Sequence, residues 1–394
     1  MPISKNYTDI TQCRCCHGES LIPVFEFEKP VPLAGHFAES LEEAKNAELF
    51  PLTLVQCQNC GAVQVRENIS DEVLFKKYNY DSSSIPALVA HFKEYADRLI
   101  QANGDKDGFT FLEIGANSFP LIQHLPKNWN IIAVDPSDVA KRASKNPKFS
   151  HVKLFNEGFN LDFVKQNNLE STVDHLFAAN CLAHISDLKP VFEGIFAALK
   201  PNGLFCVEVG DLDAIFDDKA WDFIYHEHKI NYSLHSLVKV CSLVGLFPIF
   251  NLKIKNHGGS LRVFFSKKKF IYDNTKDIEF DKLKFKYFNV HYKARYANPV
   301  AQKMLKNPNN IAYGASGRAN TWFNNMSDIR FSYVVDESPL RQGKFIPQVG
   351  IPIVGKEILE SEENKDVIVT AWNYIKGIKE KNKHLKGLNF IKPF

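Results

Sequence analysis

The stretch Tyr225-His226-Glu227-His228-Lys229-Ile230-Asn231-Tyr232 concentrates side chains that can transfer protons. Histidine titrates nearest to neutral pH, and a neighbouring carboxylate can orient its ring and stabilise the charged form. The stretch is therefore suited to a general base flanked by hydroxyl donors. A polar helix start or a surface loop would explain an isolated His-x-His pair equally well. The elements on either side must decide between these interpretations.

The composition indicates a soluble globular protein of two or three domains. The chain has 394 residues, of which 45% are hydrophobic and 24% charged, and this length exceeds one ordinary core. Its 48 Lys and Arg against 45 Asp and Glu leave a net charge of +3. That charge is too small for a general polyanion binder, so we expect no nucleic-acid partner. A local basic pocket for a phosphorylated small molecule stays open.

The beginning of the chain lacks the pattern of a secretion signal, and no run of about 18 apolar residues occurs anywhere. We therefore expect a cytoplasmic protein without a membrane partner. Thiols stay reduced in that compartment, so the eight cysteines are interpreted as metal ligands or core residues before disulfides.

Two short-spaced cysteine pairs, Cys13-x-x-Cys16 and Cys57-x-x-Cys60, predict a zinc site. Each pair presents two thiolates from one tight turn, and two such turns complete a tetrahedral site. The surrounding segment has too few apolar residues for its own core, and a metal supplies folding energy in such segments. Four sulfur ligands leave no open position, so the zinc is expected to be structural. A redox pair is the alternative, and Cys15 could substitute for a neighbouring ligand.

The middle of the chain has the pattern of a nucleotide-cofactor half-fold. An amphipathic helix is predicted over residues 85–102, followed by an apolar strand over 109–114 that runs into Gly115. An apolar helix at 121–125 and a second strand at 131–134 follow, closed by Asp135. In such folds the glycine loop lies against the cofactor, and the acid after the second strand binds ribose hydroxyls.

Further strands and helices alternate along the rest of the chain. Strands are predicted at 175–179 and 204–209 with a helix at 185–199 between them, which argues for a parallel, doubly wound sheet. Asn180, His184 and Glu208 fall at or just after strand ends, where ligands bind in such sheets. After a strand at 260–265 and a lysine-rich helix, strands at 311–314, 333–335 and 367–370 and a helix from Trp372 predict a second, smaller α/β unit.

The predicted fold class is therefore α/β, with three domains: a small zinc-binding domain at residues 1–80, a central Rossmann-like domain at 81–255 and a smaller Rossmann-like domain at 256–394. No repeat of fixed period is present.

The ordered set of motifs resembles the sugar C-methyltransferases of deoxysugar pathways over almost the whole length. The motifs are the two cysteine pairs, Glu113-x-Gly115-x-Asn117, Asn180-x-x-x-His184, Tyr225-His226-Glu227-His228, His257-Gly258-Gly259-Ser260-Leu261-Arg262, Gly314-Ala315-x-x-x-x-Asn320-Thr321 and Pro339-Leu340-x-Gln342-Gly343. The resemblance implies a zinc domain, a central S-adenosylmethionine domain, and a C-terminal domain that holds a nucleotide-linked keto sugar against it.

The resemblance also implies a mechanism, in which a base removes the proton beside a ketone and the enolate attacks the methyl of S-adenosylmethionine. His228 would be the base, and Tyr225 and Glu227 would orient it and contact the substrate. Asn180 and His184 would donate near the enolate oxygen, and Tyr80 would reach in from the end of the zinc domain. Placing donors where the charge develops must supply much of the rate.

The cofactor is expected to contact Glu113, Gly115, Asn117, Asp135 and Asn180, and the substrate His257, Gly259, Ser260, Arg262, Gly314 and Arg318. Arg262 would suit a phosphate. Structural alternatives exist for several of these residues. Asn180 could be a helix cap, His184 a core imidazole and Tyr80 a packing aromatic. His257-Gly258-Gly259 could be a turn before a strand, and residues 314–318 a plain strand-to-helix turn.

The chain departs from the family in the cofactor loop, where Glu-x-Gly-x-Asn-Asp-Gly is usual and Ser118 and Phe119 replace the last two residues. Glycine permits positive φ there, whereas a benzyl group could fill the space of the cofactor's methionine or ribose. An enzyme that enolises the sugar without methyl transfer, an epimerase or isomerase, is therefore the second hypothesis. A non-enzymatic nucleic-acid or protein-binding module is the third. We expect a monomer or a small homo-oligomer.

Overall fold

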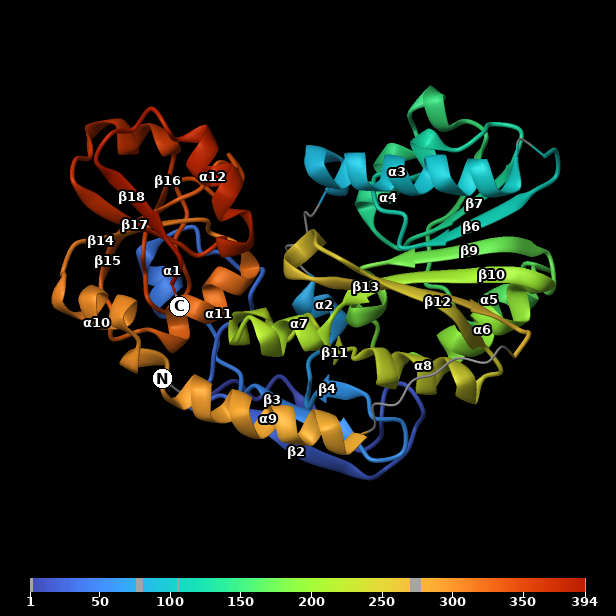
Figure 1. Cartoon of the computed structure of the whole chain (residues 1–394), viewed down its shortest axis with the longest axis horizontal. Helices are drawn as coiled ribbons and strands as arrows, with labels where there is room; N and C mark the ends of the chain where they lie inside the picture. Colours follow the sequence, from blue (N-terminus) through green and yellow to red (C-terminus); the bar gives the residue numbers. More distant parts are fainter. Residues whose placement is uncertain (1–2, 76–80, 105, 270–277, 394) are drawn as a thin grey trace.

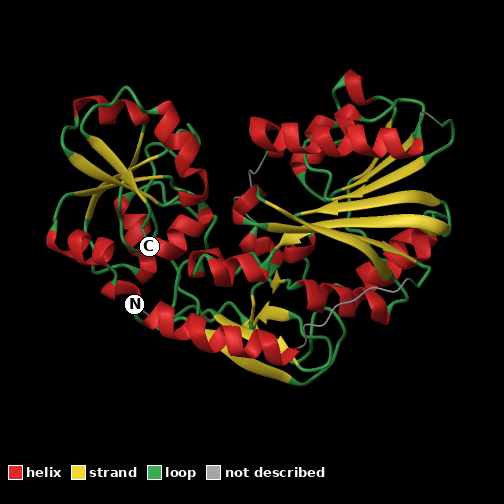
Figure 2. Ribbon diagram, in the orientation of Figure 1, coloured by secondary structure: helices red, strands yellow, loops and turns green. Residues whose placement is uncertain are grey.

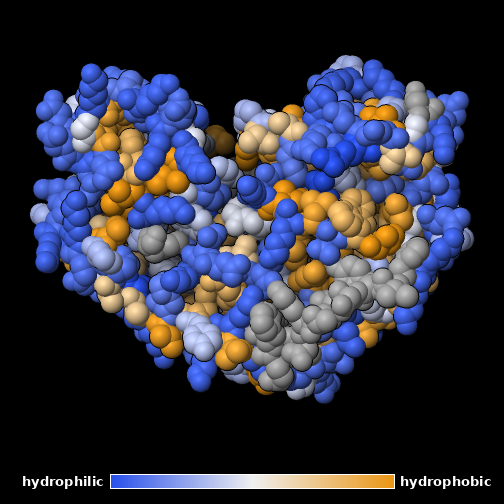
Figure 3. All heavy atoms as spheres, viewed as in Figure 1, coloured by the Kyte–Doolittle hydropathy of each residue, from blue (hydrophilic) through white to orange (hydrophobic). Residues whose placement is uncertain are grey.

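A computed structural model of the chain describes residues 3–75, 81–104, 106–269 and 278–393. Figure 1 shows two lobes that rise from a shared base, with the central domain in one lobe and the C-terminal domain in the other. The N-terminal module forms the base, together with helix α9 (Ile278–Lys293). In the space-filling view a notch separates the two lobes (Figure 3). None of the helices in the described ranges is long and apolar enough to cross a bilayer.

The N-terminal module is built on a four-stranded sheet of order β11-β4-β3-β2. Its fourth strand is β11 (Ile230–Asn231), which comes from the middle of the chain and pairs antiparallel with β4. The pairing ties the segment just after His228 to the zinc module. The other elements of the module are β1 (Thr8–Asp9), β2 (Leu21–Glu26), α1 (Leu41–Lys45), β3 (Thr53–Cys57), β4 (Val63–Val65), β5 (Glu67–Asn68) and α2 (Asp71–Leu74).

The module has only a small apolar cluster of its own, at Leu33, Phe50, Ile69 and Leu74, and its other apolar side chains pack into cores that it shares with the rest of the molecule. Its cysteines join the core of the central domain beside Tyr232 and Leu237. Its strand residues Phe25 and Leu54 join a second core with Trp221 and with helices of the C-terminal lobe. A segment that buries its apolar surface against neighbours needs no core of its own, and burial at about 25 cal/mol per Å² holds the three modules together.

The central domain is a seven-stranded sheet of order β12-β13-β10-β9-β6-β7-β8 (Figure 2). The five strands from β10 to β8 are parallel, as the sequence predicts. They are β6 (Thr110–Ile114), β7 (Asn130–Val134), β8 (Val152–Phe155), β9 (Val173–Ala179) and β10 (Leu199–Gly210). Alternate residues of β6 face opposite cores: Phe111 packs with α3 (Pro86–Asn103), and Leu112 packs with α6 (Lys189–Ala198).

The last two strands depart from a purely parallel sheet. Strands β12 (Phe247–Ile254) and β13 (Ser260–Ser266) form an antiparallel hairpin, and β13 also runs antiparallel to β10. Only antiparallel neighbours can be joined by so short a turn, because parallel strands need a long crossover. The sheet thus continues beyond the boundary expected at residue 255. The remaining helices are α4 (Asp138–Ala143), α5 (Leu161–Gln166), α7 (Leu212–Asp217) and α8 (Leu234–Leu243).

The C-terminal lobe is a five-stranded sheet of order β16-β15-β14-β17-β18, and every pairing in it is parallel. Apolar side chains of both faces are buried, with Trp322 and Phe323 of α11 (Gly317–Asn325) on one face and Ile378 of α12 (Ile375–Lys381) on the other. The other elements are α10 (Pro299–Lys306), β14 (Asn310–Tyr313), β15 (Phe331–Val335), β16 (Ile353–Val354), β17 (Lys365–Val369) and β18 (Leu388–Ile391).

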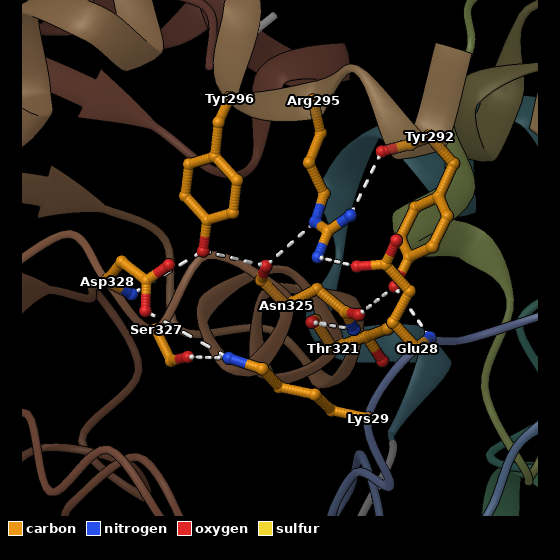
Figure 4. Close-up of polar contacts among 9 residues, drawn as sticks. All are labelled: Glu28, Lys29, Tyr292, Arg295, Tyr296, Thr321, Asn325, Ser327 and Asp328. Carbon is orange, nitrogen blue, oxygen red and sulfur yellow. Dashed lines mark hydrogen bonds and ion pairs between the residues drawn. The ribbon is translucent and has the colours of Figure 1, made fainter. Parts of the chain in front are cut away.

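Arg295 joins the zinc module to the C-terminal lobe (Figure 4). Its Nε donates to the carbonyl of Asn325 at 3.0 Å, at the end of α11, and its Nη2 pairs with Glu28 at 2.7 Å. The guanidinium lies over the ring of Tyr292, 4.3 Å from its centroid. Lys29 lies beside this network but is more exposed, and its ion pair with Asp328 is 4.0 Å long.

Replacing Arg295 by methionine is expected to lower the free energy of unfolding by about 1–3 kcal/mol, because a buried carbonyl loses its donor. Urea denaturation followed by far-ultraviolet circular dichroism measures the change. K29M is the matched control, and it is expected to change the same free energy by less than about 0.5 kcal/mol, since exposed pairs contribute little. Equal effects of the two variants would show that the network is not a structural joint.

Candidate active site

The four predicted metal ligands lie together in the zinc module, where it packs against the central domain. The Sγ atoms of Cys13, Cys16, Cys57 and Cys60 all lie within 4.8 Å of one another. Cys13 and Cys60 are 3.6 Å apart, as are Cys16 and Cys57. A tetrahedron with Zn–S bonds of about 2.3 Å has S–S edges of ~3.8 Å, so the group has the dimensions of a zinc site.

Hydrogen-bond donors surround these sulfurs. Backbone N–H groups of Cys15, Gly18 and Asn59 point to three of them, and the side-chain amide of Gln64 donates to Cys13 at 3.2 Å. Such donors stabilise thiolates and orient them toward a metal. Cys15 is buried and stands outside the group of four, so it does not replace a neighbour as a ligand. The residues fit a closed, structural zinc centre.

The predicted cofactor residues meet at the carboxyl edge of the central sheet. Gly115 follows β6 with φ of 74°, and a Cβ there would lie 2.5 Å from the Cβ of Cys181. The backbone N–H of Asn117 donates to Asp135 at 2.7 Å, and the N–H of Ser137 donates to the other carboxylate oxygen at 2.8 Å. Asn180 follows β9 with φ of 53°, and its N–H donates to the carbonyl of Glu208. The structure thus places all these residues at one edge.

Glu113 is buried at the end of β6, and its Oε2 has no hydrogen-bond partner among the described residues. Burial raises the pKa of this carboxyl well above its usual range, and the nearby charges of Asp135 and Glu208 raise it further. A buried acceptor without a partner is costly, so it indicates a missing donor such as a ribose hydroxyl.

Phe119 does not fill the cofactor space, and the expectation that it could is wrong. The residue adopts the left-handed φ of 64° that favours glycine, but its ring is buried in the core between the sheet and α3. There it meets Phe149 edge to face at 5.1 Å. The gain from burying a benzyl group offsets the strain of about 1–3 kcal/mol for such a backbone. Ser118 takes up a different contact, since its Oγ accepts from the N–H of Ser83 at 3.0 Å.

The proton-transfer cluster is centred on His228. Its Nε2 and the hydroxyl of Tyr225 are 2.7 Å apart, and the two rings lie 4.1 Å apart. The ring of His184 lies 5.2 Å from that of His228. The structure therefore brings these three predicted residues together, and His228 and Tyr225 share one hydrogen-bonded proton.

His184 is held by the backbone of the stretch at residues 225–232. Its Nδ1 is 2.7 Å from the carbonyl oxygen of Glu227, and because a carbonyl only accepts, Nδ1 carries the hydrogen. Burial lowers the pKa of His184, so the ring is neutral near pH 7 and Nε2 presents a lone pair. The sequence predicts that His184 donates a hydrogen bond to an enolate oxygen. Because Nδ1–H is already used, this donation requires a ring that is protonated at Nε2 as well.

Glu227 and His226 make hydrogen bonds with the zinc module. Glu227 accepts a hydrogen bond from the N–H of Gly35 at 2.8 Å, and burial raises its pKa. His226 donates to the carbonyl of Pro51 at 2.8 Å, and burial lowers its pKa to about 4. Both residues anchor the stretch to the zinc module.

Comparison with known proteins gives matches in all three modules. A zinc binding domain matches residues 13–75, a methyltransferase domain residues 88–247, and a C-methyltransferase C-terminal domain residues 255–394. C-methyltransferase NovU of Streptomyces niveus is 26% identical, over 98% of this chain and 95% of that protein. The chain belongs to the C-methyltransferases.

Solved structures similar to this C-methyltransferase include the 1,6-didemethyltoxoflavin-N1-methyltransferase of Burkholderia thailandensis. It is 17% identical with a TM-score of 0.35, covering 44% of this chain and 77% of the other. An S-adenosylmethionine-dependent methyltransferase of Aquifex aeolicus is 16% identical with a TM-score of 0.35, covering 48% of this chain and 98% of the other. At TM-scores this low, these similarities support no conclusion about function.

The cofactors of this C-methyltransferase are S-adenosylmethionine in the methyltransferase domain and zinc in the cysteine cluster. The strand-end edge fits the organic cofactor, because it offers the unpartnered Oε2 of Glu113 and the carboxylate of Asp135. S-adenosylmethionine supplies an electrophilic methyl on a sulfonium when bound.

The predicted substrate residues are spread over both lobes of the C-methyltransferase. Arg262 lies on β13 with its Nε 2.6 Å from Glu208, whose other oxygen is 2.8 Å from His91, so the guanidinium is already paired. A Cβ at Gly259 would lie 2.5 Å from the Cβ of Ala214. Close packing against Ala214 therefore accounts for a glycine at this position. Ser260 is buried and donates to the carbonyl of Asn256.

Gly314 and Arg318 lie at the carboxyl end of β14, on the side of the C-terminal lobe that meets the central domain. Gly314 has φ of 105°, and a Cβ there would lie 2.6 Å from that of Ala371. Arg318 is nearly buried and reaches Asp222 of the central domain. Tyr80 and the side chain of His257 lie outside the described residues, so their expected roles remain predictions.

Sequence reasoning missed several residues that shape the site. Asp222 is buried three residues before Tyr225 and has no motif to mark it. Ser82 donates to the side-chain oxygen of Asn117 at 2.8 Å and closes the start of α3 over the cofactor loop. Asn320 donates to the carbonyls of Leu33 and Ala34, in the loop that binds Glu227. The motif around Asn320 was a signal, but only the fold shows what it contacts.

Proposed function

We propose that this protein transfers the methyl group of S-adenosylmethionine to a carbon next to the ketone of a nucleotide-linked sugar. The observation that carries the proposal is the group formed by Tyr225, His228 and His184. It lies next to the carboxyl edge of the central sheet, because His184 ends the short turn that begins just after Asn180.

The proposed chemistry needs a base with a pKa near neutrality, and imidazole is that base. His228 takes the proton from the carbon beside the ketone, and the C–H electron pair forms the enolate. The enolate carbon then bonds to the methyl carbon while the carbon–sulfur bond breaks, leaving S-adenosylhomocysteine. The proton on His228 passes to solvent. A positioned base contributes about 10²–10⁴-fold, and donors to the enolate oxygen supply a further part.

The C-terminal lobe supports the choice of a nucleotide-linked substrate. Arg318, which follows β14, and Trp372, which follows β17, contact Asp222 of the central domain, and ligands bind at the carboxyl edges of such parallel sheets. Asp336 follows β15 and accepts from the N–H of Ala315 at 2.7 Å, as Asp135 does from Asn117 in the other lobe. Two edges of the same kind, one in each lobe, suit a substrate whose nucleotide and sugar occupy one lobe while the methyl donor occupies the other.

The test is incubation of the zinc-loaded protein with S-adenosylmethionine and a panel of nucleotide-linked keto sugars, followed by mass spectrometry. The expected product is one sugar nucleotide heavier by a single methylene. Binding of S-adenosylmethionine with no methylated product from any keto sugar would overturn the substrate class. The position of the new carbon–carbon bond follows from nuclear magnetic resonance of the product.

The epimerase or isomerase alternative rested on Phe119, and the burial of its ring removes that reason. Incubation in heavy water separates the two functions. Deuterium uptake into the sugar without S-adenosylmethionine shows enolisation, and uptake with inversion but no methyl transfer would establish the alternative.

A further inference from the structure

The turn that leads into the catalytic stretch is in contact with the C-terminal lobe. Residues Trp221–Phe223 form a 3-10 turn, and Tyr225 follows two residues later. Asp222 in this turn is 1% exposed. Its Oδ2 accepts a hydrogen bond from the indole of Trp372 at 3.2 Å and lies 3.7 Å from the Nε of Arg318. Both partners belong to the C-terminal lobe, so a buried charge pair crosses the interface beside the proposed base.

Arg318 is fixed in place by its own lobe. Its Nη2 donates to the carbonyl of Thr370 at 3.0 Å and to the side chain of Asn373 at 2.6 Å. The guanidinium lies 4.4 Å from the centroid of the Phe223 ring and 5.0 Å from that of Trp372, and these two rings contact each other edge to face at 5.8 Å. Two hydrogen bonds and two aromatic rings hold the guanidinium in place, with its charge close to the turn that carries Asp222.

The pair is incompletely matched. The Oδ1 of Asp222 and the Nη1 of Arg318 are buried without a hydrogen-bond partner among the described residues. A purely structural Arg–Asp pair would use both atoms in two parallel hydrogen bonds. At 3.7 Å, with no such fork, the carboxylate compensates the guanidinium only in part. The remaining field reaches Tyr225, with which Arg318 interacts electrostatically.

We propose that Asp222 and Arg318 are positioning residues that set the basicity of the Tyr225–His228 pair, Arg318 by its positive charge and Asp222 by compensating it. The proposal rests on the proposed function only in giving His228 the role of base. Because the two residues come from different lobes, His228 has its working basicity only while the lobes are together.

Other charged or titratable groups also face this pair. His184 lies against His228, and Lys229, paired with Asp71, acts on His184. Glu227 is tied to Gly35, and Tyr374 faces Arg318. These groups are the same in the two variants described below, which differ only in the sign of the charge that is removed. They therefore cannot cause shifts of opposite direction.

The test measures the protonation of His228 directly in the full-length, zinc-loaded protein, without substrate. Histidine rings are labelled with ¹³C, the His228 signal is assigned by its loss in H228Q, and its chemical shift is followed against pH. D222N is expected to lower the pKa of His228, because the charge of Arg318 is left uncompensated. R318Q is expected to raise it. Each shift should be several tenths of a pH unit or more, since charges on the order of 10 Å apart at an effective dielectric constant of about 20–40 interact by roughly 1 kcal/mol.

D222E keeps the charge and is expected to leave the titration unchanged, and the double variant D222N/R318Q should return near the wild-type midpoint. A merely structural joint would shift both single variants in the same direction or neither, and that outcome would overturn the proposal. If R318Q does not fold, D222N decides alone, since it is isosteric. The titration is independent of methyl transfer, so opposite shifts in a protein that methylates no sugar would leave this inference standing and refute only the proposed function.

Discussion

Replacing His228 by glutamine is expected to lower the rate of methyl transfer by about 10²–10⁴-fold, the usual contribution of a positioned general base. The side chain still reaches Tyr225 but cannot take up a proton. Because His228 is only partly buried and lies outside the main cores, the melting temperature should stay close to that of the wild type. Methyl transfer from radiolabelled S-adenosylmethionine measures the rate, and calorimetry with S-adenosylhomocysteine checks that cofactor affinity is retained.

His226 is the matched control, two residues away and of the same type. Its Nε2 donates to Pro51 inside the zinc module, so H226Q is expected to lower the free energy of unfolding by about 1–3 kcal/mol. The folded H226Q protein should transfer methyl groups at close to the wild-type rate. A large loss of turnover in H226Q with little loss in H228Q would reverse the assignment of the base.

His226 also contributes to the pH dependence of stability. Burial lowers the pKa of His226 from 6.5 to about 4. As the pH falls through this range, the unfolded chain takes up a proton before the folded protein does. The contribution of His226 is therefore present above pH 6.5 and is lost progressively down to about pH 4. H226Q should lose less stability over that interval, as measured by urea denaturation at each pH.

Removing one zinc ligand is expected to abolish activity, although the metal takes no part in the proposed reaction. In C60S the closed site loses a thiolate, and zinc sites of this kind contribute about 10 kcal/mol or more to folding. Strand β4 begins three residues after Cys60, and it pairs with β11, which lies within the stretch 225–232. Loss of zinc should therefore release the segment around His228. Metal analysis and hydrogen exchange of residues 225–232 measure the two effects.

C15S is the control for zinc binding, because Cys15 is buried beside the site but outside the group of four. It should retain one zinc per chain and slow hydrogen exchange in residues 225–232. Retention of zinc by C60S, or its loss from C15S, would show that the ligand set is different. Fast exchange in a zinc-loaded C60S would separate the metal from the order of the catalytic stretch.

Local patterns were sufficient for much of the fold. Strands at Phe111 and Ile131 and the helix before them are predicted by apolar spacing, because buried elements require side chains on fixed faces. The zinc ligands are equally local, since Cys-x-x-Cys brings two sulfurs together within one turn. The antiparallel β12–β13 hairpin was not predicted, because a strand's direction depends on the length of its connection and on the neighbour it meets.

The position of Phe119 also depended on tertiary structure. Its type and place in the loop indicated a clash with the cofactor, but rotation about its bonds turns the ring into the core behind the loop. Sequence spacing gives no such direction for a single side chain at positive φ. Sequence spacing likewise gave no sign that a carboxyl oxygen of Glu227 accepts a hydrogen bond from Gly35 of the zinc module.

The sequence by itself determined which chemical groups are available: four thiolates for zinc, a glycine loop and Asp135 for a cofactor, and an imidazole next to a phenol. These follow from residue type and short spacing, which the covalent chain fixes. Only the tertiary structure decided which groups meet. Asp222 and Arg318 are far apart along the chain, and Glu227 and Gly35 likewise, so their contacts exist only because burial of apolar surface brings three modules together around one site.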